Sequence, residues 1–168
     1  MKKIYALLFI LSTFTAWAQG IEKEINEHVW KPFTRGIINQ DVAGFISVHS
    51  TDLVRAERNT KKVLGWQEYR KEMEANWPLW KERNLKDQLT YTFELRFTER
   101  INNANIAYEV SYFKNETTNP AGEKKIQYGK FQVALRKESG TWKILVDSDS
   151  NEGGVITEKD FLAAKSLE

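Results

Sequence analysis

The sequence predicts an α+β fold, in which a curved antiparallel sheet wraps around three N-terminal helices and a short helix ends the chain. Two patterns predict this class. Apolar residues recur at helical spacing in the first half of the chain, and alternating apolar and polar residues fill most of 87–147. The expected order is helix, helix, strand, helix, four long strands and a terminal helix, with no βαβ unit.

The first 18 residues are set apart from this fold. Lys2 and Lys3 precede an unbroken apolar run over 4–11, and Ala16-Trp17-Ala18 fits the small-x-small pattern of signal peptidase sites. The run is shorter than the roughly 20 residues that a membrane-spanning helix needs. We therefore expect a signal peptide at 1–18, one domain at 19–168, and a periplasmic or secreted protein that leaves the membrane after cleavage.

Composition narrows the classes of partner. There is no cysteine, so a disulfide or a lipid-modified cysteine at the cleavage point is excluded. Loss of Lys2 and Lys3 lowers the 25 basic residues to 23, which equals the 23 acidic residues, all of which follow residue 18. The mature chain is therefore formally neutral, and its charge gives no support for nucleic-acid binding.

Two helices are expected before the first strand. The first spans 20–38, where Pro32 should kink it, and its apolar stripe repeats every four residues: Ile21, Ile25, Val29, Phe33 and Ile37. Asp41 is a suitable N-cap for a second helix over 42–50, which carries His49 near its end.

A strand over 52–58, a turn or hairpin over 59–65 and a third helix over 66–77 follow. Pro78 should close that helix, because proline disfavours helical geometry at the residue before it, Trp77. The four long strands are expected at 88–100, 105–114, 125–137 and 141–149, joined by turns or by the loop at 115–123. Residues 158–168 should form the terminal helix.

Aromatic residues gather on one face of the predicted sheet and on the third helix. Buried Tyr and Trp side chains need partners for their polar tips, so they serve either as plain core or as the wall of a ligand pocket. The predicted ligand-binding set is Tyr69, Trp77, Tyr91, Tyr108, Tyr112 and Tyr128. The expected ligand is a small, largely apolar molecule.

The ordered elements resemble the nuclear transport factor 2-like superfamily, which includes the SnoaL-like and ketosteroid-isomerase-like cone folds. "IINQDVAGFISVHSTDLVR" at 37–55 is similar to its second-helix entry, and "GTWKILVDSD" at 140–149 to its last strand. The resemblance implies a SnoaL-like cone domain with a pocket at its wide end. Some members are isomerases, dehydratases or cyclases, and many are binding or dimeric modules, so the fold alone supplies no chemistry.

A second apolar surface is predicted on the other face of the sheet. It consists of Phe113, Phe131, Val133 and Leu145. In the family that the chain resembles, a partner subunit often covers such a face, and we therefore expect a homodimer. Charged residues on the strands are interpreted as cross-strand pairs on a solvated or dimer-facing surface: Arg55, Glu57, Glu94, Arg96 and Glu109.

An enzyme is the alternative to a binding module. The candidate catalytic residues are His49, Asp52 and Asp147, because imidazole titrates near neutral pH and the isomerase-like and dehydratase-like relatives use pocket Asp, Tyr or His residues. By strict alternation Asp147 shares a face with Lys143, opposite Ile144, so no dyad follows from the sequence. An isomerase, dehydratase or hydrolase that uses His49 with a pocket carboxylate remains open.

The stretch "DSDSNEGGVITEKDF" at 147–161 is similar to a calcium-binding loop. Read from Asp149, the candidate ligands are Asp149, Asn151, Thr157 and Asp160, with Gly154 at the sharp turn. One ligand position is glycine, the last is the short Asp160, and a strand enters where an EF-hand has a helix. The other interpretation is a turn followed by a Thr157–Asp160 helix cap. No cofactor is required, and a dimeric accessory module with a structural calcium loop at 149–160 is the third hypothesis.

Overall fold

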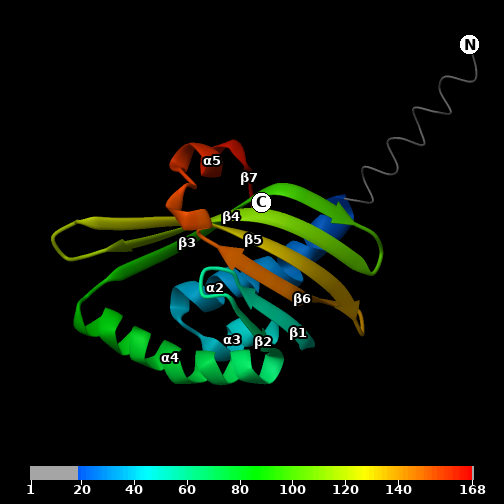
Figure 1. Ribbon diagram of the computed structural model, residues 1–168, viewed down its shortest axis with the longest axis horizontal. Helices are drawn as coiled ribbons and strands as arrows, with labels where there is room; N and C mark the ends of the chain where they lie inside the picture. Colours follow the sequence, from blue (N-terminus) through cyan, green and yellow to red (C-terminus); the bar gives the residue numbers. More distant parts are fainter. Residues whose placement is uncertain (1–18, 168) are drawn as a thin grey trace, which may run out of the picture.

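The computed structural model describes residues 19–167, so the predicted signal peptide lies outside the described residues. Within this range the predicted α+β architecture is confirmed, with the helices of the first half of the chain on the concave side of one curved sheet (Figure 1). After a helical stretch at 19–25 the helices are η1 (Asn26–Trp30, a π-helical turn), α2 (Lys31–Asn39), α3 (Val42–Ser47), α4 (Trp66–Lys86), η2 (Glu152–Gly154) and α5 (Glu158–Ala163). The strands are β1 (His49–Glu57), β2 (Lys62–Gly65), β3 (Thr90–Asn102), β4 (Ile106–Thr118), β5 (Lys124–Glu138), β6 (Thr141–Ser150) and β7 (Lys165–Ser166).

The first helical segment follows its predicted stripe closely. All five stripe residues are buried, and Trp30 beside them is fully buried. The disturbance expected at Pro32 takes the form of η1, in which the Lys31 N–H donates to the carbonyl of Asn26. A π-helical turn therefore carries the helix past a residue that has no N–H to donate.

A tight turn joins α2 to α3. Gln40 ends α2 in the left-handed region, with φ of 52°, and Asp41 then caps α3 by accepting a hydrogen bond from the Gly44 N–H at 3.1 Å. Gly36 lies directly against Phe45, since a Cβ on it would be 2.9 Å from the Phe45 backbone. This glycine lets the two helices approach closely enough to share one core.

Three predicted helix ends were wrong. The terminal helix, expected over 158–168, ends at Ala163, and Lys165–Ser166 pair with β3 as β7. The second helix ends at Ser47 and His49 begins β1, because His49 pairs with Ile144 of β6 in extended conformation. The third helix runs through Pro78 to Lys86. Glu74 and Pro78 both face solvent, so water can satisfy the helix carbonyl that the proline leaves without a donor.

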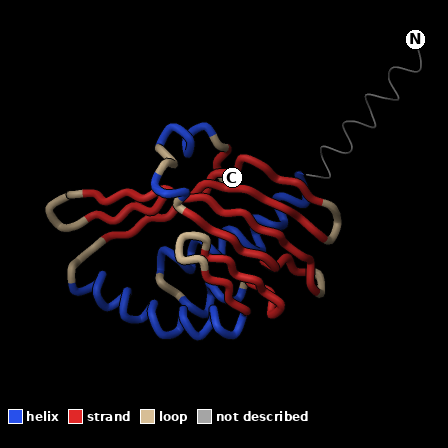
Figure 2. Tube along the Cα trace, viewed as in Figure 1, coloured by secondary structure: helices blue, strands red, loops and turns tan. Residues whose placement is uncertain are grey.

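The sheet has seven strands in the order β2-β1-β6-β5-β4-β3-β7. All neighbours are antiparallel except β1 and β6, which are parallel, so the sheet is mixed rather than purely antiparallel as predicted. Figure 2 shows α4 crossing below the concave side and the β4–β5 hairpin projecting beyond the other strands. The parallel pair places Arg55 opposite Asp147 and Glu57 opposite Asp149.

The faces of β6 differ from strict alternation. The register of β6 with β5 shifts between Ile144 and Val146, which is a β-bulge at Leu145. Beyond the bulge Asp147 points to the same side as Trp142 and Ile144, and all three are buried. The predicted placement of Asp147 opposite Ile144 was therefore wrong, because one extra residue reverses the side of every residue after it.

The prediction also exchanged the inward-facing and outward-facing residues of β4. Phe113 pairs with Leu95 of β3, and Ser111 pairs with Phe97 and with Phe131 of β5, so these residues share the concave face. The expected second apolar surface is thus mostly core, since Phe113, Phe131 and Val133 belong to it or pack against it.

Tyr108, Tyr112 and Tyr128 lie on the opposite, convex face, which corrects their predicted place in the pocket. The cause is the polar concave side of β4, where buried Glu109 accepts hydrogen bonds from Trp30 Nε1 at 2.5 Å and Arg100 Nε at 2.8 Å. Because its hydrogen bonds allow this carboxylate to lie in the core, a charged residue occupies an inward position of β4. The alternation of apolar and polar residues then assigns the two faces of the strand in reverse.

The C-terminal segment covers the convex face. Figure 1 shows α5 and β7 on the side of the sheet away from α2, α3 and α4. Phe161 of α5 is buried, with its ring 5.7 Å from that of Tyr128 and 5.1 Å from the Arg96 guanidinium. Among residues 19–167, no helix is long and apolar enough to cross a membrane.

Candidate functional site

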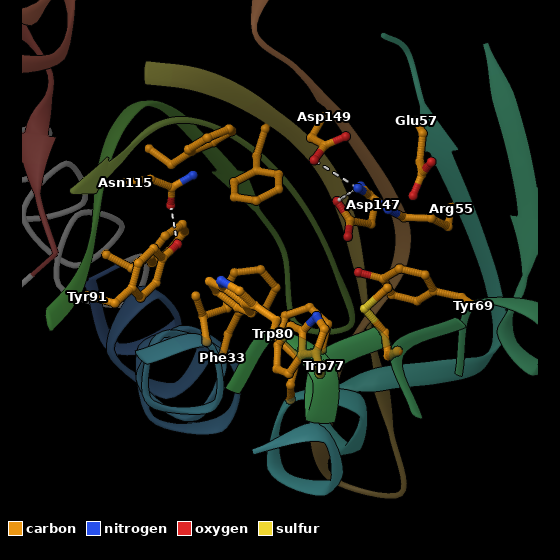
Figure 3. Close-up of a pocket in the computed structure, with 16 residues that line it drawn as sticks. Phe33, Arg55, Glu57, Tyr69, Trp77, Trp80, Tyr91, Asn115, Asp147 and Asp149 are labelled. Atoms are coloured by element: carbon orange, nitrogen blue, oxygen red, sulfur yellow. Dashed lines mark hydrogen bonds and ion pairs between the residues drawn. The ribbon is translucent and has the colours of Figure 1, made fainter. Parts of the chain in front are cut away.

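A cavity of about 230 Å³ lies between the concave face of the sheet and helices α2, α3 and α4. Its apolar wall is formed by Phe33, Ile37, Phe45, Tyr69, Met73, Trp77, Trp80, Tyr91, Phe93, Phe113 and Phe131. Its polar groups are Arg55, Glu57, Asn115, Asp147 and Asp149. Figure 3 shows the charged groups together on one side, with Tyr91 and Asn115 on the other and the Trp77 and Trp80 rings between them.

Continuous ring contacts build the helical side of the wall. The Trp77 ring lies 4.6 Å from Phe45 and 6.0 Å from Trp80, and Trp80 in turn lies 5.0 Å from Tyr91. Because Trp77 and Trp80 are three residues apart on α4, they project from the same side of that helix. The continuation of α4 past Pro78 therefore places Trp80 in the cavity wall.

On the sheet side, Phe113 depends on a glycine. A Cβ on Gly129 would lie 2.0 Å from the Phe113 ring, so only glycine leaves room for that ring to cross β5. The ring then packs 4.8 Å from Phe131, which extends the aromatic wall along the sheet. Glycine at this position thus shapes the cavity rather than a turn.

The polar end is organised by Arg55, whose side chain is only 7% exposed. Its Nη1 lies 3.0 Å from Asp147 Oδ1, and its Nη2 lies 2.8 Å from Asp149 Oδ2. The guanidinium also lies over the Tyr69 ring, 5.3 Å from the centroid. Alternate residues of two in-register parallel strands, β1 and β6, bring these charges together.

Burial and ion pairing oppose each other at these groups. Burial acts to raise the pKa of Asp147, but Arg55 and His49 outweigh it and hold that pKa below its ordinary value. For Asp149, burial dominates over Arg55 and raises the pKa. Burial acts to lower the pKa of Arg55, yet Asp147, Tyr69 and Asp149 together raise it, so the guanidinium stays charged. Burial raises the pKa of the Tyr69 hydroxyl as well, which stays protonated.

His49 lies behind this cavity rather than in its wall. Its Nδ1 is 3.0 Å from the Phe45 carbonyl oxygen, and its Nε2 is 3.7 Å from Asp147 Oδ2, beyond hydrogen-bond reach. The ring is packed 5.0 Å from Phe45 and 5.6 Å from Tyr69. His49 instead lines a separate hollow of about 540 Å³ on the far side, together with Trp66 and Arg70.

The predicted catalytic set is only partly assembled. His49 and Asp147 are neighbours, but the Asp52 side chain is 66% exposed and forms an ion pair with Arg136 at 2.6 Å. Asp52 therefore cannot act with the other two at one site.

Three of the six aromatic residues assigned to ligand binding line the cavity: Tyr69, Trp77 and Tyr91. The Tyr91 hydroxyl donates to Asn115 Oδ1 at 2.6 Å, which fixes both side chains at the end away from Arg55.

Sequence reasoning missed Arg55 and Glu57 as cavity residues. Leu53 is buried on the same inward face, but Val54 and Ala56 are apolar as well, so the alternation in β1 does not show which face points inward. Asp149 was assigned to a metal loop, and the structure instead pairs it with Arg55.

The proposed calcium ligands have separate structural roles. Asn151 Oδ1 accepts a hydrogen bond from the Gly153 N–H at 3.0 Å, and Asp160 accepts from the Thr157 hydroxyl at 2.7 Å in the predicted helix cap. Within residues 19–167, no cluster of three His, Cys, Asp or Glu side chains has the geometry to hold a metal ion. The calcium loop stays a prediction.

Comparison with known proteins identifies the fold. No protein-family model matches the chain, and no curated protein is similar enough in sequence to be matched. Solved structures do match. A protein of unknown function from Mycobacterium tuberculosis is 17% identical with a TM-score of 0.59, and the match covers 90% of this chain and 80% of that one.

Two further structures carry descriptive names. An NTF2-like protein of unknown function from Pseudomonas putida is 15% identical with a TM-score of 0.57, over 79% of this chain and 87% of that one. A ketosteroid isomerase-like protein from Erwinia carotovora is 16% identical with a TM-score of 0.53, over 76% and 95%. At these identities the likeness establishes the fold, which is NTF2-like and ketosteroid-isomerase-like, and not an activity.

Proposed function

We propose that this NTF2-like domain binds a small, largely apolar molecule in the cavity between its sheet and helices. The observation that carries the proposal is the cavity itself, with its aromatic wall and one polar end. Ligand sites are typically concave, mostly apolar and equipped with a few convergent polar groups. At about 230 Å³ the space is small for such a site and suits one ring with a short substituent.

The arrangement of the polar groups supports binding rather than core packing alone. A core that needed only stability would gain little from a buried Arg55 between two carboxylates, because desolvation offsets much of the attraction in such a cluster. Charged groups at one end of an apolar space give a ligand a defined orientation. The Tyr91–Asn115 pair supplies neutral hydrogen-bonding groups at the other end.

Native mass spectrometry of the purified mature chain tests the proposal. A bound small molecule should appear as added mass that is lost on collisional activation, and the same spectrum reports the number of subunits. The variant Trp80→Ala removes part of the wall and should lower occupancy. Trp66→Ala is the matched control, because Trp66 is on the same helix and outside the cavity lining.

Small single-ring compounds added to the same samples complete the test. Binding that is weakened by Trp80→Ala and unchanged by Trp66→Ala supports the proposal. A chain that neither co-purifies with a molecule nor binds any single-ring compound would refute it.

An enzyme of the isomerase, dehydratase or hydrolase kind is the second candidate, and the proximity of His49 to Asp147 favours it. A general base must reach the proton it removes, and His49 lies outside the cavity lining. Asp147 lines the cavity, but Arg55 keeps its pKa low and makes it a weak base. Substitution of His49 by Asn should leave ligand binding intact, and loss of a measured turnover in that variant would favour the enzyme.

The proposal also includes the cellular location and the oligomeric state of the protein. On the strength of the leader pattern at 1–18, we place the mature domain in the periplasm or outside the cell. We also retain a homodimer, although three of the four residues that suggested it belong to the concave face. A dimeric accessory module with calcium at 149–160 is the third candidate, and calcium titration tests it.

A further inference from the structure

The charge inside the cavity is unbalanced. Arg55 is the one basic side chain among the described residues that line it, whereas Glu57, Asp147 and Asp149 are acidic. The ionised groups therefore leave an excess of negative charge at the polar end. Figure 3 shows all four of these side chains on the same side of the cavity.

Arg55 is already occupied by protein carboxylates. Its two terminal nitrogens lie 3.0 Å from Asp147 and 2.8 Å from Asp149, so an anionic ligand would compete with both for one guanidinium. An anion would also meet the negative charge of Glu57, whose cross-strand neighbour Lys62 is paired with Glu72. Like charges at close range in a partly buried site cost affinity for that ligand.

One acidic atom at this end has an ion-pair contact but no well-directed hydrogen-bond donor. Asp147 is 1% exposed, lines the cavity, and its Oδ1 has no hydrogen-bond partner among residues 19–167 apart from the ion-pair contact with Arg55. A buried acceptor of this kind favours a ligand that brings an N–H group. The Nε and Nη1 of Arg55 also have no acceptor in hydrogen-bond geometry among these residues, and a hydroxyl or a water molecule is sufficient for each.

The aromatic wall favours positive charge as well. A cation is attracted to the face of Trp or Tyr when it lies within about 6 Å of the ring centre. The cavity already uses this contact, because the Arg55 guanidinium lies 5.3 Å from the centre of the Tyr69 ring. Trp77 and Trp80 extend the same kind of surface towards the apolar end.

From these observations we infer that the ligand is a small organic cation, an amine with one ring or a similar apolar body. The ammonium group lies at the acidic end near Asp149 and Glu57, and the apolar body lies against the wall formed by Trp77 and Trp80. This inference rests on the proposed function and adds the charge of the ligand to it.

Isothermal titration calorimetry with three matched compounds tests the inference on the purified mature chain. Benzylamine is a cation at neutral pH, benzyl alcohol is its neutral counterpart and benzoate is an anion of similar size. We expect benzylamine to bind about 10-fold or more tightly than benzyl alcohol, as one charge-assisted hydrogen bond implies. Benzoate should bind more weakly than either.

Two glutamate variants test whether the preference for a cationic ligand comes from the cavity. Glu57→Gln keeps the size of the side chain and should lower benzylamine affinity several-fold while leaving benzyl alcohol unchanged. Glu94→Gln is the control, because Glu94 is an exposed glutamate on the other face of the sheet. Melting temperatures of both variants establish that they fold, and among residues 19–167 the Glu57 side chain accepts a hydrogen bond from the Thr60 hydroxyl that a glutamine can retain.

The outcomes separate the two proposals. Benzyl alcohol or benzoate binding as tightly as benzylamine would overturn the cation inference and leave the binding function standing. An equal loss of benzylamine affinity in Glu94→Gln would overturn it too, since the effect would not come from the cavity. Binding of none of the three compounds overturns the cation inference for ligands of this size and also counts against the proposed function.

Discussion

Replacement of Arg55 by methionine is the sharpest perturbation of the polar end. Methionine fills a similar volume and keeps the strand apolar on its inward side, but it removes the charge between Asp147 and Asp149. Two carboxylates are then left next to each other, and one of them is almost fully buried. The loss of folding stability measures how strongly the guanidinium holds them.

The size of the effect follows from burial. The side chain of Arg55 is 7% exposed and that of Asp147 is 2% exposed, so water cannot replace the lost partner. Breaking a buried ion pair by removal of one member costs about 3–5 kcal/mol. Asp149 is 28% exposed and contributes the smaller share, because solvent reaches it in the variant. We therefore expect a loss of about 3–5 kcal/mol at pH 7.

Urea unfolding followed by tryptophan fluorescence measures this loss. With a slope of about 2 kcal/mol per molar urea, the midpoint should fall by about 1.5–2.5 M. The wild-type pKa of Asp147 is below its unfolded value, so the stability from its ionised form is present above about pH 4 and is lost as pH falls through the folded pKa. In Arg55→Met only His49 still opposes burial, so the pKa of Asp147 rises above its wild-type value and the ionised carboxylate stabilises the variant less. The difference between the two proteins should therefore shrink from pH 7 towards pH 4.

Arg58→Met is the matched control. Arg58 also forms an ion pair, with Glu152 at 2.6 Å, but both side chains are partly exposed, at 43% and 32%. Such pairs contribute about 0–1 kcal/mol. A loss in Arg55→Met no larger than in Arg58→Met, or one that is the same at pH 4 and pH 7, would refute the assignment of a buried charge cluster.

Three further predictions concern packing and metal binding. Gly129→Ala should lose about 1–3 kcal/mol and weaken ligand binding, because the new Cβ displaces the Phe113 ring from the cavity wall; unchanged urea unfolding would contradict this. Phe161→Ala should cost about 3–5 kcal/mol and expose the convex face to hydrogen exchange, since that ring is buried there, whereas an undocked α5 in the wild-type protein would make the substitution nearly silent. Millimolar calcium should leave the melting temperature unchanged, because the four candidate ligands at 149–160 already have partners, and a rise that Asp160→Ala abolishes would instead support the calcium loop.

The element types could be predicted from the sequence because their periodicities are strong. The stripe from Ile21 to Ile37 and the alternation of Phe93, Leu95 and Phe97 each have a regular period, and both sets are buried. Asp41 and Thr157 were also predicted correctly as helix caps, since capping depends on residues only three apart. Patterns that depend only on residues close together in the sequence therefore predicted the structure correctly.

The faces of the strands were harder to predict because they depend on single-residue events. A bulge at Leu145 has no compositional signature, yet it turns Asp147 from the expected outward side into the cavity. Glu109 also led to a wrong assignment, because a glutamate in a strand is expected to face solvent. In the structure it is buried, with Trp30 and Arg100 as its hydrogen-bond donors. Tyr108 and Tyr112, which lie on the same strand as Glu109, were misplaced for this reason.

The parallel pairing of β1 with β6 has a consequence for the order of folding. Arg55 and Asp147 are separated by more than half of the chain, with α4 and three long strands between them. Contacts between such distant segments carry a high entropic cost of loop closure, and they form after the local hairpins of β3, β4 and β5. We therefore expect the cluster to be completed on the native side of the rate-limiting barrier. Weakening it should accelerate unfolding and leave the refolding rate nearly unchanged, which stopped-flow kinetics of Arg55→Met would reveal.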